Sequence, residues 1–69
     1  MREWTRNRLR VIRAEQRVTQ FTMAQRLGVS QTQYWQIEHA IREPDAAMQR
    51  RIAKALGVPV PALVGTKAP

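Results

Sequence analysis

Two short segments with a helical pattern, residues 19–27 and 31–39, restrict the possible folds more than any other feature because so few residues separate them. Thr19 is placed to cap the first segment, and Gly28 is typical of a residue that ends a helix. Ser30 is placed to cap the second segment only two residues after this glycine. Two short helices with so tight a connection must cross at a steep angle.

A further helix is predicted near the N-terminus, over residues 4–17, where apolar residues sit among arginines. Thr5 is placed to cap this helix. Trp4 and Leu9 then have the spacing of a hydrophobic staple, in which a residue before the cap packs on one inside the first turn.

The fourth predicted helix begins at the cap residue Asp45 and ends at Gly57. Its apolar stripe consists of Met48, Ile52, Ala55 and Leu56. A short turn restricted by two prolines follows, and its apolar residues can cover the bundle. No apolar–polar alternation is long enough for a strand. We therefore expect an all-α fold, a compact bundle of four to five short helices in one domain at residues 1–64, with residues 65–69 as a flexible tail.

Composition excludes several classes of protein. The chain has 69 residues, no cysteine and a single histidine, which leaves no disulfide and no ligand cluster for zinc. No apolar run approaches the roughly 20 residues that cross a bilayer, and the N-terminus does not read as a signal sequence, which favours the cytoplasm. The chain shows no nucleophile–base pair, carboxylate pair or phosphate-binding glycine loop, so we expect no enzyme, no cofactor and no small-molecule ligand.

The segment QTQYWQIE, residues 31–38, divides into two faces on a helical wheel. Tyr34, Ile37 and Glu38 share one side. The other side carries Thr32, Trp35, Gln36 and His39, with Gln31 at the exposed N-terminal end. This outward face is rich in groups that both donate and accept hydrogen bonds, as the edges of DNA bases require, and a glutamine amide can pair with adenine in the major groove.

The net charge of +7 also favours a polyanionic partner, although arginine can simply keep a small protein soluble. A solvated helix face is the plain alternative for the glutamines. Arg6, Arg8 and Arg10 are placed either along a phosphate backbone or on a solvated face that adds only long-range attraction.

The order of these motifs resembles the helix-turn-helix DNA-binding domains of the Cro/cI type, the XRE family. The resemblance runs from about Leu9 to Leu63 and is carried by LRVIR, TQFTMAQRLGVS, QTQYWQIE and, after Pro44, RIAKALGV. It implies a lambda repressor-like fold with the helix at residues 31–39 in the major groove.

The resemblance also implies roles for single residues. Base contacts would come from Gln31, Thr32 and Gln36, with Trp35 beside them. Phosphate contacts would come from Gln20, Ser30, His39 and Arg42, and Gln20 would also support Gln31. Arg13 and Glu38 occupy the places of a semi-buried structural ion pair.

Several residues depart from the family pattern. Ala40 stands where glycine usually follows the recognition helix, so the left-handed cap is either strained or replaced by another geometry. Arg17 also stands where glycine is common. Thr22 replaces an acidic residue and leaves the capping box incomplete. Phe21 and Trp35 are large for positions that tend to be exposed, and either could contact a DNA sugar, a thymine methyl group or a protein partner.

The function that follows is that of a prokaryotic or phage regulator that binds a double-stranded DNA operator. One helix reads few base pairs, so a homodimer on a near-palindromic site, acting as a repressor, is expected. Val60, Leu63 and Val64 are candidates for its interface, and Trp4 is a second candidate. Two rival functions remain: a protein-interaction module such as an antitoxin or adaptor that uses Phe21 and Trp35, and a basic protein that coats RNA or an anionic membrane.

Overall fold

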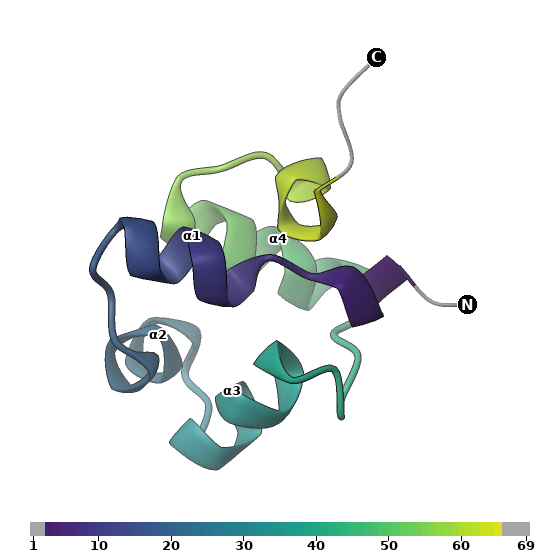
Figure 1. The fold of residues 1–69 in the computed structure, drawn as a ribbon. Helices are drawn as coiled ribbons and strands as arrows, with labels where there is room; N and C mark the ends of the chain where they lie inside the picture. The colour runs from purple at the N-terminus through teal and green to yellow at the C-terminus, as the bar shows by residue number, and fades with distance from the viewer. Residues whose placement is uncertain (1–2, 66–69) are drawn as a thin grey trace.

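Four α-helices follow one another in the computed structural model, which describes residues 3–65 of the chain (Figure 1). They are α1 (Leu9–Glu15), α2 (Gln20–Leu27), α3 (Gln31–Glu38) and α4 (Ala46–Leu56). Two short 3-10 helices flank them, η1 (Glu3–Arg6) and η2 (Val60–Val64). No strand occurs within the described range, so the prediction of an all-α bundle is confirmed. Residues 66–69 of the expected tail lie outside the described residues.

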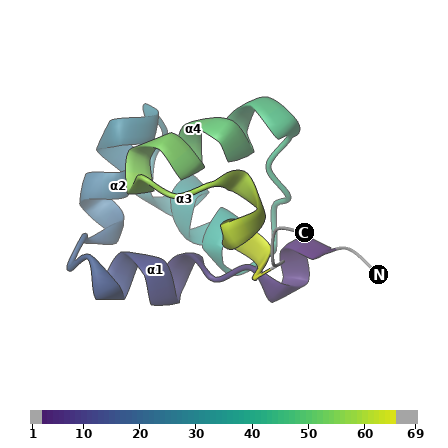
Figure 2. The same ribbon diagram turned by 90° about the horizontal axis from the view of Figure 1, so that it is seen from above.

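The arrangement brings the two ends of the described chain together. The two views show η2 beside η1, at the N-terminal end of α1 (Figures 1 and 2). The backbone N–H of Arg8 donates to the carbonyl of Leu63 over 2.7 Å. α2 packs against both α3 and α4, so the two helices of the tight connection share one core with the rest of the bundle.

The three predicted helix caps at Thr19, Ser30 and Asp45 are confirmed. Each side-chain oxygen accepts a hydrogen bond from the backbone N–H three residues later, at 3.0 Å for Thr19, 3.0 Å for Ser30 and 2.8 Å for Asp45. These bonds satisfy donors that have no partner inside a helix. The Thr19 hydroxyl in turn donates to the Thr22 hydroxyl at 3.0 Å, a bond between side chains that takes the place of the bond to the cap's backbone N–H in a complete capping box.

The predicted start of the first helix, with Thr5 as its cap, is wrong. Thr5 lies inside η1, and α1 begins only at Leu9. The residue at the N-cap position is Arg8, whose side chain makes no cap bond, and the Oδ1 of the preceding Asn7 accepts from the backbone N–H of Leu9 at 3.1 Å instead. The physical reason is Trp4, which is buried in the core and donates from its indole Nε1 to the carbonyl of Ile37 over 2.7 Å. The chain must bend between Trp4 and Leu9 for both side chains to reach the same core.

All four α-helices are followed by a residue in the left-handed backbone conformation. Two of these residues are glycines, Gly28 (φ 71°) and Gly57 (φ 67°), and the other two are Arg17 (φ 57°) and Ala40 (φ 60°). After α3, the N–H of Ile41 donates to the carbonyl of Gln36 at 2.9 Å, and the N–H of Ala40 donates to that of Ile37 at 3.2 Å. This pair of bonds is the Schellman motif. Ala40 therefore keeps the glycine-type turn and carries its steric strain.

Two arginines tie the C-terminal turns of α2 and α4 to each other. Arg26 Nη1 donates to the carbonyl of Ala55 over 3.2 Å, and Arg51 Nη2 donates to that of Leu27 over 2.6 Å. The carbonyls of a last helical turn have no partner inside their own helix, so these bonds complete them. These bonds hold α2 and α4 side by side at the end of α2 that leads into the connection to α3.

The hydrophobic core draws on every element. Its buried members are Trp4, Leu9, Ile12, Met23, Ala24, Leu27, Tyr34, Ile37, Ile52, Ala53, Leu56 and Leu63. Tyr34 and Ile37 point inward, as the helical wheel predicts, while Met48, Val60 and Val64 pack against the core and are only partly buried. The burial of Leu63 and Trp4 overturns their candidacy for a dimer interface, because neither side chain is available to a second chain.

Candidate nucleic-acid interface

The outward side of α3 carries polar and aromatic side chains that the core does not use. Gln31, Thr32, Trp35 and His39 are exposed, and Gln36 is half-buried. Tyr34, Ile37 and Glu38 are buried on the opposite side. The division of the helix into two faces therefore follows the predicted one. The division follows from helical spacing. Tyr34, Ile37 and Glu38 lie on the side of the helix that faces the bundle, and the remaining positions face away from it.

A shallow hollow lies where the start of α2 meets the first turns of α3. Its lining residues are Gln20, Gln31, Thr32 and Trp35, and its volume is about 390 Å³. We call it the α3 hollow. Three of its four lining side chains offer amide or hydroxyl groups, and the fourth offers an aromatic surface. It can therefore accept a flat group that has a polar edge and an apolar part.

Trp35 is held in place by its neighbour one turn later. Its ring stacks on the His39 ring with a centroid distance of 4.2 Å and an interplanar angle of 25°. The Nδ1 atom of His39 lies 3.0 Å from the carbonyl oxygen of Trp35. Because a carbonyl only accepts, His39 carries a proton on Nδ1 in this geometry. Trp35 keeps 41% of its surface exposed, so the stack stands on the outside of the bundle.

A buried ionic network lies behind the α3 hollow. Arg13 donates to Glu38 through two bonds, Nε to Oε2 at 2.9 Å and Nη2 to Oε1 at 3.0 Å. Gln20 Nε2 donates to Oε1 of the same carboxylate at 3.2 Å. Burial opposes the charge of Glu38, but hydrogen bonds led by those from Arg13 outweigh it and lower the pKa of Glu38 below its usual range. The carboxylate therefore stays ionised and orients Gln20.

The hydroxyl of Tyr34 also reaches this buried region. It is buried and forms no hydrogen bond with the rest of the described chain. Burial is the main cause that raises the pKa of Tyr34 far above its usual value, with the nearby charge of Glu38 adding to it. Tyr34 therefore keeps its proton and is neutral at physiological pH, and its ring serves as part of the core.

The predicted phosphate-side residues surround α3. Ser30 is exposed at its start and uses Oγ as the helix cap, which leaves its hydroxyl proton free to donate. Arg42 is exposed beyond its end, where the turn at Ala40 fixes the path of the chain and the backbone N–H of Arg42 donates to the carbonyl of Gln36 at 3.1 Å. Gln20 is half-buried, and one of its two amide protons is engaged by Glu38. Apart from Gln20, which begins α2 and lines the α3 hollow, these candidates and those for base contact thus lie at the two ends and the outer face of α3.

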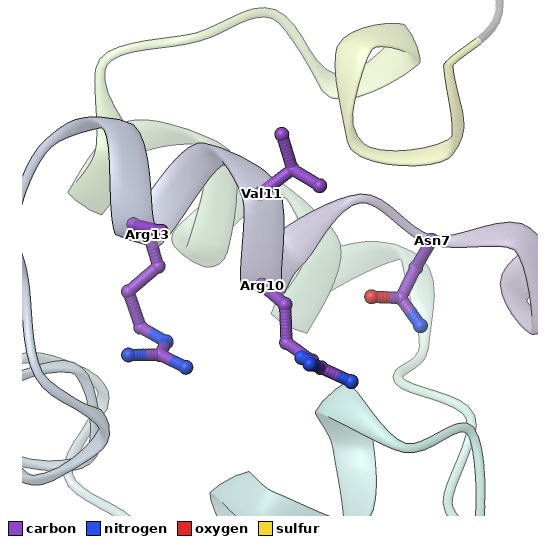
Figure 3. Close-up of a pocket in the computed structure, with 5 residues that line it drawn as sticks. Asn7, Arg10, Val11 and Arg13 are labelled. Carbon is purple, nitrogen blue, oxygen red and sulfur yellow. The ribbon is translucent and has the colours of Figure 1, made fainter.

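A second hollow, of about 580 Å³, lies along α1 and is lined by Asn7, Arg10, Val11, Arg13 and Ala14. Figure 3 shows Arg10 and Arg13 projecting from α1 toward α3, with Asn7 on the segment before α1 pointing to the same side, while Val11 points the other way. Arg6, Arg8 and Arg10 are all exposed, in agreement with either of their predicted roles.

Sequence reasoning missed Asn7. Its Nδ2 donates to the carbonyl of Trp4 and to that of Glu38, both at 3.0 Å, so it links the N-terminal turn to the end of α3. Asparagine is favoured at the starts of helices, and Asn7 stands two residues before the first apolar position of α1, so this signal was available in the sequence. The missed bond to Glu38 could not be read from it, because the two residues are far apart along the chain.

Comparisons with known proteins support a single assignment. The model of a family described as a helix-turn-helix domain matches residues 6–64. No curated protein matches the chain. Across residues 3–65, no helix is both long and apolar enough to cross a membrane. The same residues contain no group of three acidic, histidine or cysteine side chains that could hold a metal ion.

Proposed function

The chain belongs to the helix-turn-helix domain family, and from this premise we propose that it is a sequence-specific transcriptional regulator that binds double-stranded DNA. The observation that carries the proposal is the outer face of α3, where the exposed Gln31 amide and Thr32 hydroxyl line the α3 hollow beside the Trp35 ring. Groups of this kind match the donor and acceptor pattern of base edges in the major groove. The protein acts by occupying its site in the cytoplasm, not by catalysis.

In this mechanism α3 enters the major groove with its N-terminal end foremost. Gln31, Thr32 and Gln36 contact base edges, with Trp35 beside them. Gln31 and Thr32 are exposed and the structure gives their side chains no hydrogen-bond partner within residues 3–65, so base contact breaks no existing bond. A bidentate pair between a glutamine amide and adenine is worth about 1–3 kcal/mol of discrimination against another base.

Contacts to phosphate fix the position of α3 on the duplex but carry no sequence information. We assign them to Gln20, Ser30, His39 and Arg42, which flank the base-reading residues. A net charge of +7 supports attraction to DNA over a longer range. The Arg13–Glu38 pair has a structural role in this account, since both side chains join α1 to α3 behind the contact surface.

A homodimer completes the proposal, because one short helix reads too few base pairs for specificity in a genome. Two copies related by a two-fold axis bind a near-palindromic operator whose half-sites lie about one helical turn apart. Repression by occupancy is the simplest outcome. Of the interface candidates, Val60 and Val64 are half-buried and remain open to a second chain.

Selection of bound sites from a pool of random duplexes tests this function. The expected result is an enriched motif with two inverted half-sites separated by about one helical turn. An enriched single half-site would retain DNA reading and remove the dimer from the proposal. A pool with no enriched motif would contradict sequence-specific binding itself.

A protein-interaction module is a second candidate function, and exposed apolar side chains favour it. Phe21 keeps 56% of its surface exposed and Ile41 keeps 62%. Ile41 differs here from Val18, Val29 and Val58, which take the same position after the other three α-helices and pack against the core. If Phe21→Ala and Ile41→Ala leave the affinity for the selected duplex unchanged but abolish capture of a protein partner, these side chains form a protein-binding surface separate from the DNA-contacting face.

A further inference from the structure

We propose that the α3 hollow receives the major-groove edge of a thymine and that the Trp35 ring packs against the C5-methyl group of this base. The inference rests on the proposed function, since it needs α3 to lie in the major groove. It goes further by naming the base that the hollow takes and the side chain that selects it. Three features of the hollow support it: one fixed apolar wall, one fixed polar wall, and two further lining residues that can donate hydrogen bonds.

Trp35 supplies the apolar wall. Its stack on His39, at a centroid distance of 4.2 Å, and the contact of His39 Nδ1 with the Trp35 carbonyl at 3.0 Å restrain both rings. A restrained ring loses little conformational entropy when it meets a ligand. Trp35 is 41% exposed and lines the hollow, so its free surface gains by covering an apolar group.

Gln20 supplies the polar wall, and Glu38 sets its orientation. An ionised carboxylate only accepts hydrogen bonds, so the Gln20 amide must turn its nitrogen toward Glu38, as the 3.2 Å contact with Oε1 shows. Its carbonyl oxygen is then directed away from that carboxylate. Gln20 thus offers an oriented acceptor to one N–H of the Gln31 amide, which lines the same hollow, and leaves the second N–H of that amide to donate to a base.

Gln31 and Thr32, which also line the hollow, supply donors, because neither side chain has a hydrogen-bond partner in the part of the chain that the structure describes. Thymine is the base that suits this combination. In the major groove it offers the O4 acceptor next to the C5-methyl group, whereas cytosine offers a donor at N4 and no methyl group, and neither purine carries a methyl group. Donors beside an apolar wall therefore favour thymine over the other three bases.

Uracil scanning of the selected operator tests the inference. Replacing one thymine at a time by uracil removes a methyl group and leaves every hydrogen-bonding atom in place. We expect one position in each half-site at which this change weakens binding about fourfold, the effect of one buried methyl group. Trp35→Ala should bind the thymine and uracil forms equally, and Trp35→Phe should retain most of the difference. Val11→Ala, which changes an exposed apolar residue on α1, is the matched control and should keep it fully.

The possible outcomes distinguish a failure of the thymine contact from a failure of sequence-specific DNA binding. A selected motif in which no thymine is sensitive to uracil, or which contains no thymine, overturns this inference and leaves sequence-specific binding intact. Sensitivity that survives in Trp35→Ala assigns the methyl contact to another residue and also overturns it. A selection that yields no motif overturns the proposed function together with the inference.

Discussion

Arg13 and Glu38, which lie on α1 and α3, share two nearly equal hydrogen bonds of 2.9 and 3.0 Å. The Glu38 side chain is 0% exposed and that of Arg13 is 18% exposed. Both groups are therefore charged and largely shielded from solvent. The planar guanidinium matches the carboxylate in geometry, so the two bonds form side by side. It fixes the back of the surface that Gln20 and α3 present.

Removing one partner of this pair should cost more than removing both. Arg13→Met leaves the Glu38 carboxylate buried and unpaired, and we expect the free energy of unfolding to fall by about 3 kcal/mol. Glu38→Leu added to Arg13→Met should restore part of this loss, because no uncompensated charge remains. Urea denaturation of the single and double variants measures the coupling. Strictly additive losses would show that the two residues do not act as a pair.

The same pair predicts a dependence of stability on pH. The folded pKa of Glu38 lies below its ordinary value of 4.5, because hydrogen bonds led by those from Arg13 outweigh the opposing effect of burial. The unfolded chain then takes up this proton at a higher pH than the folded chain. The contribution of Glu38 is thus complete above the unfolded pKa and is lost as the pH falls through the folded pKa.

We therefore expect the difference in unfolding free energy between the wild type and Glu38→Gln to shrink from about pH 7 to about pH 3. Glutamine has nearly the shape of the protonated acid and does not titrate, so Glu38→Gln is the reference that lacks the proton equilibrium at this position. Denaturation curves at several pH values measure this difference. A difference that stays constant with pH would mean that Glu38 does not titrate with folding.

Glycine at the strained turn after α3 should stabilise the protein. Ala40 has a φ of 60°, a conformation that costs a residue with a Cβ atom about 1 kcal/mol or more. Ala40→Gly relieves this strain, and we expect a net gain of about 1 kcal/mol after the added flexibility of the unfolded chain is subtracted. Ala14→Gly, inside α1, is the matched control and should lower stability by about 0.5–1 kcal/mol. Thermal denaturation distinguishes the two, and a loss in both variants would contradict the strain.

The sequence predicted the ends of helices correctly where each end depends only on neighbouring residues. The caps at Thr19, Ser30 and Asp45 and the stops at Gly28 and Gly57 need only neighbouring residues, and each lies where the sequence predicts it. The predicted start of the first helix is wrong because Trp4 lies in the core and bonds to the carbonyl of Ile37 on α3, and no local pattern contains that information.

The candidate DNA-contacting surface could also be predicted only in part from the sequence. The outward face of α3 follows from helical periodicity alone. The stack of Trp35 on His39 and the bond from Gln20 to Glu38 depend on side-chain rotamers and on the crossing of α2 over α3, which the sequence does not specify. For the turn at Ala40 the sequence allows two geometries for a related reason, since the free-energy cost of a strained left-handed residue must be compared with that of another path of the chain.

Arg42 should contribute to affinity without contributing to specificity. Its side chain is exposed just beyond α3, and a phosphate contact there releases about one counterion. Arg42→Ala should weaken binding to all duplexes similarly and reduce the slope of log affinity against log salt concentration by about one. Ile41→Ala, in the same turn, is the uncharged control and should leave the slope unchanged. If the slope for Arg42→Ala equals that of the wild type, the residue does not contact phosphate.

The central claim is that the amides of Gln31 and Gln36 read base edges, and the ratio of affinities for the selected operator and a scrambled duplex tests it most directly. Measured at one salt concentration, this ratio should fall by about tenfold or more in Gln31→Ala and in Gln36→Ala, because each loses a contact worth about 1–3 kcal/mol. Affinity for the scrambled duplex should stay close to that of the wild type. An unchanged ratio in both variants would contradict the account.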